Sequence, residues 1–489
     1  MLTYERFAVA SGHPLTNEVG MRILRHGGNA YDAAIAVSAA LTVVQPHLNG
    51  LGGDLFAITT DGEIRALDGS GYAAGLASIG YFRKNGFEDI PAYGPLSAFS
   101  VPGMVSAWSL LYERCNMRFQ DLIKPAIELA RNGFFPSPAI VKAIESTRGN
   151  TDWNLIYTGA SVERKLMQKD LANTLEEISK DEGHSFYHGS IAHAIERDMV
   201  SRGGLIRFDD LDSYEAQFLK PIHVSYHGYT VYTNPPPSQG ATAMMWLNML
   251  DRVDLASMDK KDYYDELIRT MRIAYSYRSR YIGDPRYVTF PEDILEPGYK
   301  YRSLPASEDG KTSLSDTTAF SVYDGDYGIS AIQSNYTGFG SGFTIAGLGI
   351  NMNNRGSYFT LNGEHHNSLE PGKKTFHTLM AVYASGSDEV FLGTMGGDVQ
   401  PQVDVQVLSG IIDKNRSAQA AVAYPRFAWP ASIYGGSDLY CEASLNLDGA
   451  KKVEDNSRMM GHAHAIITGD RFSTGLDPRG DGLILNYRR

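Results

Sequence analysis

The sequence predicts a layered α+β fold, in which helices and antiparallel strands are largely segregated along the chain. Helical patterns fill most of the first 300 residues, and strand hairpins dominate the remainder. Because hairpins pair strands antiparallel, this order differs from the alternating pattern of a nucleotide-binding parallel sheet.

The first two helices carry clear boundary signals. Residues 17–26 have apolar side chains at helical spacing, and Gly27-Gly28 is a suitable stop. Asn29 is placed to cap a second helix over residues 30–43, which Pro46 ends. The many alanines of this second helix allow close packing on several sides.

A glycine-rich turn at residues 49–54 leads into a predicted hairpin. Its strands are residues 55–60 and 63–67, joined by Asp61-Gly62, a favoured two-residue turn. Helical patterns follow at residues 104–178 (in the main), 190–202, 241–252 and 262–281.

The pattern changes near residue 300. Residues 299–315 are polar, which predicts an exposed, mobile segment. Strands are expected afterwards at residues 318–323, 329–334, 378–383 and 389–395, and a helix at residues 399–412.

Composition excludes several classes of protein. The chain has 489 residues, of which 43% are hydrophobic and 20% charged, with a net charge of −12 and no clustered basic face, so we expect no nucleic-acid partner. The longest apolar stretch, residues 30–44, is too short to cross a bilayer, and no secretory signal is evident, so a cytoplasmic location is expected. Cys115 and Cys441 are expected to be free thiols.

The junction Asp316-Thr317-Thr318 joins the polar segment to a strand. In one interpretation it is simply a loop that enters a strand. In the other, the chain is cut before Thr317, whose new α-amine then serves as the base that a threonine hydroxyl needs to become a nucleophile. Such an amine has an ordinary pKa of about 8, which suits proton transfer near neutral pH.

Gly396-Gly397 lies between a predicted strand and a predicted helix. Glycines there let backbone N–H groups approach a developing oxyanion, and one such donor contributes about 3–4 kcal/mol to the transition state. A plain strand-to-helix turn is the alternative.

No metal or cofactor is expected. Glu364-His365-His366 lacks the i, i+4 spacing of a helical metal site, and His462 and His464 alternate as in a strand. Residues 338–342 contain Gly-x-Gly but lack the strand-turn-helix context of a phosphate loop.

Several segments together resemble one family, the γ-glutamyltransferases, in order and over nearly the whole chain. They are residues 10–15, 27–34, 45–47, 50–53, Val101-Pro102-Gly103, residues 235–240, Gly283-Asp284-Pro285, Thr317-Thr318, Gly338-Phe339-Gly340, Gly396-Gly397, Pro425-Arg426-Phe427 and Asp477-Pro478-Arg479.

The resemblance implies a four-layer αββα sandwich of the N-terminal-nucleophile hydrolase type. It also implies autocatalytic cleavage into a large part, residues 1–316, and a small part, residues 317–489, which form one intertwined unit. Thr317 then corresponds to the nucleophile, and Gly396 and Gly397 to the oxyanion-hole glycines. Ala319 departs from the family's Thr-Thr-His start.

The pocket for the γ-glutamyl group departs further. Ser70 stands where the family has a carboxylate-clamping arginine, and His377-Thr378 replaces its paired serines. Arg355 and Tyr358 stand where groups that hold the substrate's amine are expected. Losing a bidentate arginine removes charge-assisted contacts, so an ordinary γ-glutamyl donor is expected to bind poorly.

Residues 333–336, which include Ser334, Asn335 and Tyr336, together with Arg355 resemble instead the acylase and oxamate-amidohydrolase-like branch. In this interpretation Arg355 binds a substrate carboxylate, with a structural ion pair or loop anchor as the alternative. Ser334 or Asn335 is a candidate to orient the amine of Thr317.

Three functional hypotheses follow. The first is hydrolysis of a small amide bearing a carboxylate, through an acyl-enzyme on Thr317. The second is true γ-glutamyl hydrolysis or transfer, for example on glutathione. The third is an uncut, non-catalytic homologue that binds a small acid. Processed parts are expected to associate, with a dimer of heterodimers as one possible assembly.

Overall fold

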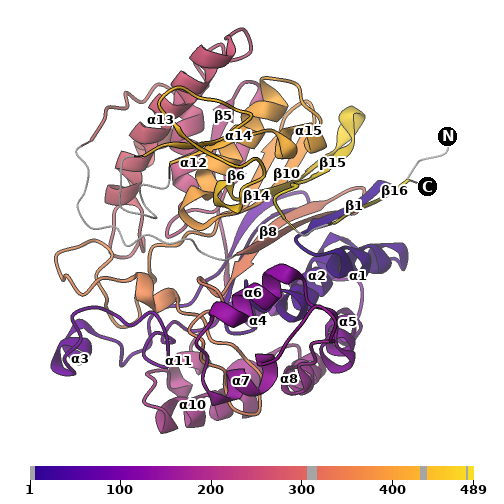
Figure 1. The fold of residues 1–489 in the computed structure, drawn as a ribbon, viewed down its shortest axis with the longest axis vertical. Coiled ribbons are helices and arrows are strands. Elements are labelled where there is room, and N and C mark those ends of the chain that lie inside the picture. The colour runs from indigo at the N-terminus through magenta and orange to yellow at the C-terminus, as the bar shows by residue number, and fades with distance from the viewer. Residues whose placement is uncertain (1–5, 305–316, 430–437, 481–482, 489) are drawn as a thin grey trace.

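The computed structural model describes residues 6–304, 317–429, 438–480 and 483–488. It contains two large antiparallel sheets with helices grouped outside them (Figure 1). The α+β class predicted from the sequence is confirmed. Asp316, and the predicted polar segment from residue 305 onward, lie outside the described residues.

One sheet has seven strands, and both halves of the chain contribute to it. Every neighbouring pair in it is antiparallel. In spatial order the strands are β16 (Leu483–Arg488), β1 (Arg6–Ser11), β7 (Thr318–Tyr323), β8 (Gly328–Ser334), β2 (Asp54–Thr60), β3 (Ile64–Gly69) and β4 (Gln217–Leu219).

The other large sheet has six strands, also paired antiparallel throughout. In spatial order they are β15 (Ser473–Leu476), β14 (His462–Ile467), β10 (Glu389–Met395), β9 (Val382–Ser385), β6 (Tyr229–Thr233) and β5 (Ile222–Tyr226). A small third sheet contains β11 (Phe427–Ala428), β12 (Tyr440–Glu442) and β13 (Lys451–Val453).

The helices fall into two groups, one beside each large sheet (Figure 1). The group from the first half comprises α1 (Pro14–Arg25), α2 (Ala30–Val44), α3 (Ile79–Lys84), α4 (Met104–Tyr112), α5 (Phe119–Asn132), α6 (Pro138–Ser146), α7 (Thr151–Tyr157), α8 (Lys169–Lys180), α9 (His184–His188), α10 (Ser190–Ser201) and α11 (Phe208–Asp212). The group beside the six-stranded sheet comprises α12 (Gly240–Leu250), α13 (Lys260–Tyr281), α14 (Gln400–Ile412) and α15 (Ala418–Ala423).

Three apolar clusters hold these layers together. One lies between the two sheets and includes Phe56 of β2, Ile332 of β8 and Phe391 of β10. A second joins the seven-stranded sheet to the first helix group, and a third joins the six-stranded sheet to α12, α13 and α14. β2 and β8 are buried along their whole length, and in β2 this burial on both faces explains the continuous apolar run from Leu55 to Ile58.

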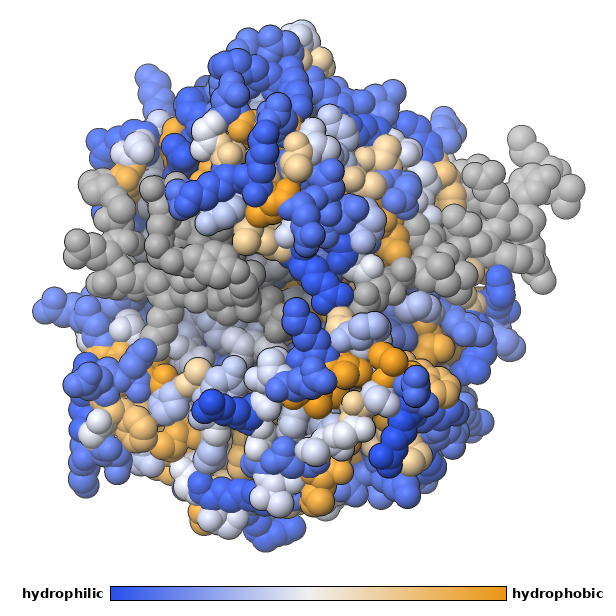
Figure 2. Space-filling model, viewed as in Figure 1, coloured by the Kyte–Doolittle hydropathy of each residue, from blue (hydrophilic) through white to orange (hydrophobic). Residues whose placement is uncertain are grey.

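The face of the molecule in Figure 2 is mostly hydrophilic, and its apolar residues form small groups. None of the helices in the described ranges is long and apolar enough to span a membrane.

The predicted helix start at Asn29 is confirmed, because its side chain accepts from the N–H of Asp32 and Asp32 accepts from the N–H of Asn29. The first predicted hairpin is also confirmed as β2 and β3, but its connection is the three residues 61–63, because Thr60 pairs with Ile64, and not the predicted two-residue turn. The strand predicted over residues 378–383 begins later than expected, at Val382. Backbone groups of residues 378–381 bond instead to the side chains of Asn234, Ser238 and Gln239.

Candidate active site

Thr317 lies immediately before β7 and is 3% exposed. The next residue, Thr318, donates its hydroxyl to Gln45 Oε1 at 2.7 Å, and Gln45 Nε2 donates to the carbonyl of Gly12 at 2.9 Å. A Cβ on Gly12 would lie 2.8 Å from Thr318 Oγ1, so only glycine leaves room for this contact. These contacts hold the start of β7 in place.

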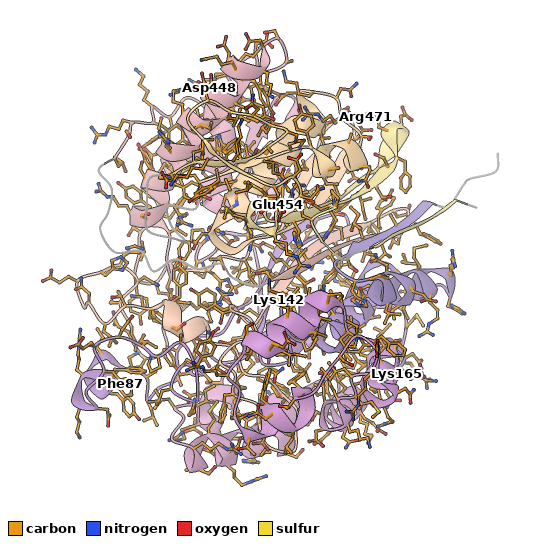
Figure 3. The ribbon with its side chains drawn as sticks, viewed as in Figure 1. Phe87, Lys142, Lys165, Asp448, Glu454 and Arg471 are labelled. Carbon is orange, nitrogen blue, oxygen red and sulfur yellow. The ribbon has the colours of Figure 1, made fainter. Side chains whose placement is uncertain are left out.

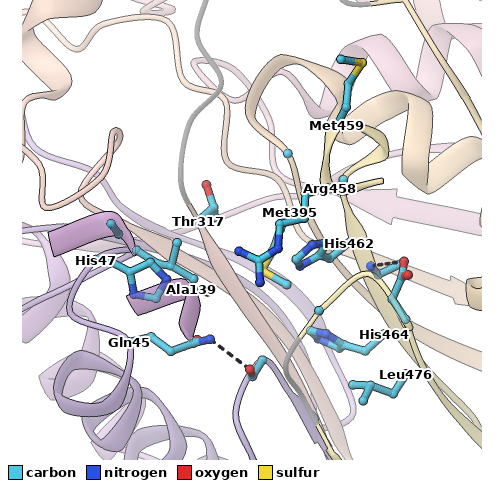
Figure 4. Close-up of a pocket in the computed structure, with 18 of the residues that line it drawn as sticks. Gln45, His47, Ala139, Thr317, Met395, Arg458, Met459, His462, His464 and Leu476 are labelled. Carbon is cyan, nitrogen blue, oxygen red and sulfur yellow. Dashed lines mark hydrogen bonds between the residues drawn. The ribbon is translucent and has the colours of Figure 1, made fainter. Parts of the chain in front are cut away.

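A cavity of about 470 Å³ opens beside Thr317 (Figure 4). One wall comes from the first half of the chain, including Gln45, His47 and Lys142. The opposite wall comes from the second half, including Gly396 and Arg458. The structure thus places the predicted nucleophile and one of the predicted oxyanion glycines on the same cavity.

The Gly396-Gly397 turn follows β10 and leads into α14. Both residues have positive φ, +141° at Gly396 and +57° at Gly397, a conformation that favours glycine. A Cβ on Gly396 would lie 2.8 Å from Val399 Cγ2. Within the described residues, neither backbone N–H has a hydrogen-bond acceptor, as a donor to a substrate oxyanion requires.

Buried side chains hold the carbonyls of this turn from behind. Gln239 Nε2 donates to the carbonyls of Thr378 at 2.7 Å and Gly397 at 2.8 Å. The hydroxyl of Tyr275 donates to the carbonyl of Asp398 at 2.6 Å. These bonds fix the Gly397–Asp398 and Asp398–Val399 peptides, so the backbone just after the two proposed N–H donors is kept in place.

An ion pair continues this network. Arg278 Nη1 donates to Asp398 Oδ1 at 2.6 Å and to Gln239 Oε1 at 3.0 Å. Burial alone would lower the pKa of Arg278, but the Asp398 carboxylate raises it above its ordinary value. Arg278 therefore remains charged and keeps Asp398 and Gln239 in position.

Arg355, His377 and Thr378 lie together in a second buried cluster. Arg355 Nε donates to Asp54 Oδ2 at 3.2 Å, and its Nη1 donates to Thr378 Oγ1 at 3.1 Å. The ring of Tyr336 packs on the guanidinium, with 4.4 Å from its centroid to Arg355 Cζ. Arg355 is 1% exposed and Asp54 is fully buried, so the arginine's charge is already matched inside the protein.

His377 completes this cluster as a neutral imidazole. Burial, reinforced by the charge of Arg355, lowers the pKa of His377 to about 4. Its Nδ1 accepts from the N–H of Leu379, so the proton is on Nε2, which donates to Asp54 Oδ2 at 3.0 Å. Burial by itself would raise the pKa of Asp54, but the hydrogen bond from His377 and the charge of Arg355 leave it lowered.

Three further predicted residues are buried but do not line the cavity. Ser70 donates its hydroxyl to Asp68 Oδ1 at 2.6 Å. Ser334 Oγ accepts from the N–H of Tyr336 at 2.7 Å, and Asn335 Nδ2 donates to the carbonyl of Asn351 at 3.2 Å. The contacts of Ser334 and Asn335 shape the turn after β8. The proposed role of either residue in orienting the amine of Thr317 stays a prediction.

Two sequence motifs far apart in the chain meet at the cavity wall. Asp477 accepts from Arg426 and, at 2.8 Å, from Arg479 Nη1. Arg479 also bonds to Glu442, 2.9 Å from its Nε to Oε1. The charges of Arg426 and Arg479 hold the pKa of Asp477 below its ordinary value although burial opposes this.

Sequence reasoning missed the roles of Gln45, Gln239, Arg278 and Asp398. Gln45 and Gln239 fall inside quoted motifs, residues 45–47 and 235–240, so the signal was present without an assigned role. Arg278 is one of several arginines at the end of a helix, and no local pattern distinguishes it. In the described ranges no group of three or more His, Cys, Asp or Glu side chains could hold a metal ion.

The class of protein follows from comparison with known sequences. The family model described as Gamma-glutamyltranspeptidase matches residues 16–487. The chain therefore belongs to the γ-glutamyltranspeptidase family, as the sequence motifs predicted.

Individual relatives refine this assignment. The chain is 34% identical to the glutathione hydrolase-like YwrD proenzyme of Bacillus subtilis, over 98% of each chain. It is 30% identical to the oxamate amidohydrolase proenzyme of Klebsiella pneumoniae, over 97% of each chain. Among solved structures, the cephalosporin acylase from Bacillus halodurans matches with a TM-score of 0.89 and 31% identity, covering 99% of this chain and 96% of that one.

Proposed function

We propose that this chain is a self-processing amide hydrolase with the four-layer αββα arrangement of N-terminal-nucleophile hydrolases. The observation that carries the proposal is that Thr317 immediately precedes β7 and lines one cavity together with Gly396. Two relatives that match nearly the whole chain are named proenzymes, which supports a processing step.

Processing begins at the bond between Asp316 and Thr317. Thr317 Oγ attacks the carbonyl carbon of Asp316, the peptide C–N bond breaks, and the acyl group moves to Oγ as an ester. Water then hydrolyses the ester. The products are residues 1–316 and residues 317–489, the latter starting with a free α-amine that is a base, unlike the peptide nitrogen it replaces.

The mature site then hydrolyses an amide in two steps. The α-amine takes the proton from Thr317 Oγ as the oxygen attacks the substrate carbonyl, and the N–H groups of Gly396 and Gly397 stabilise the oxyanion. The amine returns its proton to the leaving nitrogen when the C–N bond breaks. Water, deprotonated by the same amine, releases the acid from the acyl-enzyme.

The proposed substrate is a small amide that carries a carboxylate. Arg355 was the partner suggested by the sequence, but its charge is matched by Asp54 and its side chain is buried away from the cavity. We therefore assign Arg355 to holding the turn that carries Thr378. True γ-glutamyl hydrolysis or transfer is the second candidate, favoured by the 34% identity to a glutathione hydrolase-like protein.

The first experiment is the intact mass of the purified protein under denaturing conditions, beside a Thr317→Ala variant. Two fragments that meet between Asp316 and Thr317, absent from the variant, are expected. A chain that remains uncut on long incubation would contradict the proposal and favour a non-catalytic homologue. With processed protein, turnover of a γ-glutamyl anilide against simple acyl anilides separates the two candidate activities.

A further inference from the structure

The cavity beside Thr317 is lined by charges that differ from those of the chain as a whole. The chain carries a net charge of −12, yet among the described residues that line the cavity Lys142 and Arg458 are cationic and only Asp477 is acidic. A cleft lined by one sign of charge concentrates ligands of the opposite sign.

The one carboxylate among the described lining residues is already paired behind the cavity wall. Asp477 is 2% exposed and is bound to both Arg426 and Arg479, so its charge is balanced behind the wall. His464, also on the lining, is neutral, because burial lowers its pKa to about 3. The described residues of the lining therefore contribute two cationic side chains and no carboxylate without a cationic partner.

The two cationic side chains come from different halves of the chain and line the same cavity as Thr317. Lys142 is exposed on α6, in the first half of the chain, and no ion pair of the described residues includes it (Figure 3). Arg458 lies just before β14, and Figure 4 shows its guanidinium reaching into the cavity between Thr317 and His462. An anionic group held between them would lie close to the nucleophile.

We propose that Lys142 and Arg458 form a carboxylate subsite that positions the substrate's acidic group beside Thr317. This inference rests on the proposed amide hydrolysis and gives the carboxylate a different partner from Arg355. A planar guanidinium binds a carboxylate through paired N–H donors, and a lysine adds a mobile point charge. Both contacts are made at the rim or wall of the cavity, where the substrate enters.

Three chromogenic amides locate the carboxylate. Glutaryl para-nitroanilide carries it on the acyl part, pentanoyl para-nitroanilide is the neutral match, and the pentanoyl amide of aminonitrobenzoate carries it on the leaving group. The processed protein is expected to prefer one acidic amide over the neutral amide, and the preferred amide tells which side of the scissile bond the subsite serves.

Charge variants then test the residues. The preference is the ratio of kcat/KM for the preferred acidic amide to kcat/KM for the neutral amide. Lys142→Met should lower this ratio by about 10-fold, mainly through KM, and Lys142→Glu should lower it further. Arg458→Gln should act likewise. Lys165→Glu makes the same charge change at an exposed position away from Lys142 and should leave the ratio unaltered (Figure 3).

A measurement without turnover separates this proposal from the proposed function. Glutarate should bind the wild-type protein in isothermal titration, and Lys142→Glu should weaken its binding about 10-fold or more. Two results would overturn the proposed subsite: cleavage of all three amides with equal kcat/KM, or glutarate binding that Lys142→Glu leaves unchanged. Neither result would contradict the proposed amide hydrolysis. If Arg458→Gln fails to process, the exposed Lys142 variants still decide the matter.

Discussion

Replacing Gln239 by leucine tests whether this buried side chain keeps the Gly396-Gly397 turn in position. Gln239 is fully buried and makes three hydrogen bonds, two as donor to the carbonyls of Thr378 and Gly397 and one as acceptor from Arg278. Leucine fills similar space but makes none of them. We expect the Gly397–Asp398 peptide to become freer to move, which shifts the backbone of Gly397 and so misaligns the N–H of that residue.

The size of the effect follows from these contacts. Each of the three buried hydrogen bonds contributes about 1 kcal/mol, so the unfolding free energy should fall by ~3 kcal/mol. A well-placed oxyanion donor contributes about 3–4 kcal/mol, and a misaligned one loses part of this, so kcat should fall about 10- to 100-fold with little change in KM.

Gln406→Leu is a matched control. Gln406 is 7% exposed and makes the same set of bonds, two as donor to the carbonyls of Gln402 and Phe427 and one as acceptor from the N–H of Phe427. Both variants should lose similar stability in urea unfolding, but only Gln239→Leu should lose kcat. Equal kcat in the two variants, after equal processing, would refute the idea that Gln239 positions the turn.

Three other predictions concern the same region. Gly396→Ala should lower both stability and kcat, because a side chain at φ +141° costs about 1–3 kcal/mol. Gly62→Ala, at φ +92° in an open turn, should lower stability alone. Equal losses of kcat in the two variants would contradict this prediction. Arg355→Met should cost about 3–5 kcal/mol by leaving Asp54 buried without its cation, and adding Asp54→Asn should recover part of the loss in urea unfolding. His377 has a pKa of about 4 against an ordinary 6.5, so the unfolded chain binds its proton first as pH falls. Its contribution to the unfolding free energy is complete above pH 6.5 and is lost toward pH 4, at up to about 1.4 kcal/mol per pH unit. The unfolding free energy measured at pH 7 and at pH 5 should therefore differ less for His377→Gln than for the wild-type protein.

Local signals in the sequence were enough to predict many of the elements. The Asn29 cap and the hairpin signal at Asp61-Gly62 each depend on a few neighbouring residues, and both the cap and the hairpin are present in the structure. The start of β9 was wrong because residues 378–381 bond to side chains from residues 234–239, a contact between distant segments. No periodicity within residues 378–383 carries that information.

The same distinction applies to the site. Thr317 and Gly396 became candidates through their position at junctions between elements together with the family resemblance. The pairing of Arg355 with Asp54 joins residues 301 positions apart, so the sequence left both a carboxylate-binding and a structural role open. Charge alone made Arg355 the natural candidate for a substrate carboxylate, and only its burial against Asp54 turns attention to Lys142 and Arg458.

The position of β7 has a consequence for any cut before Thr317. β7 pairs with β1 on one side and with β8 on the other, so the new terminus would begin an interior strand. Beyond β1, β16 from the C-terminal end completes the sheet, so strands of the small part enclose a strand of the large part. Separating the two parts would expose the apolar cluster between the sheets, which includes Ala10 from one part and Ile332 from the other. We therefore expect processed protein to elute as one species in native gel filtration and to separate into two only after denaturation; native separation would mean that the strands are not interleaved.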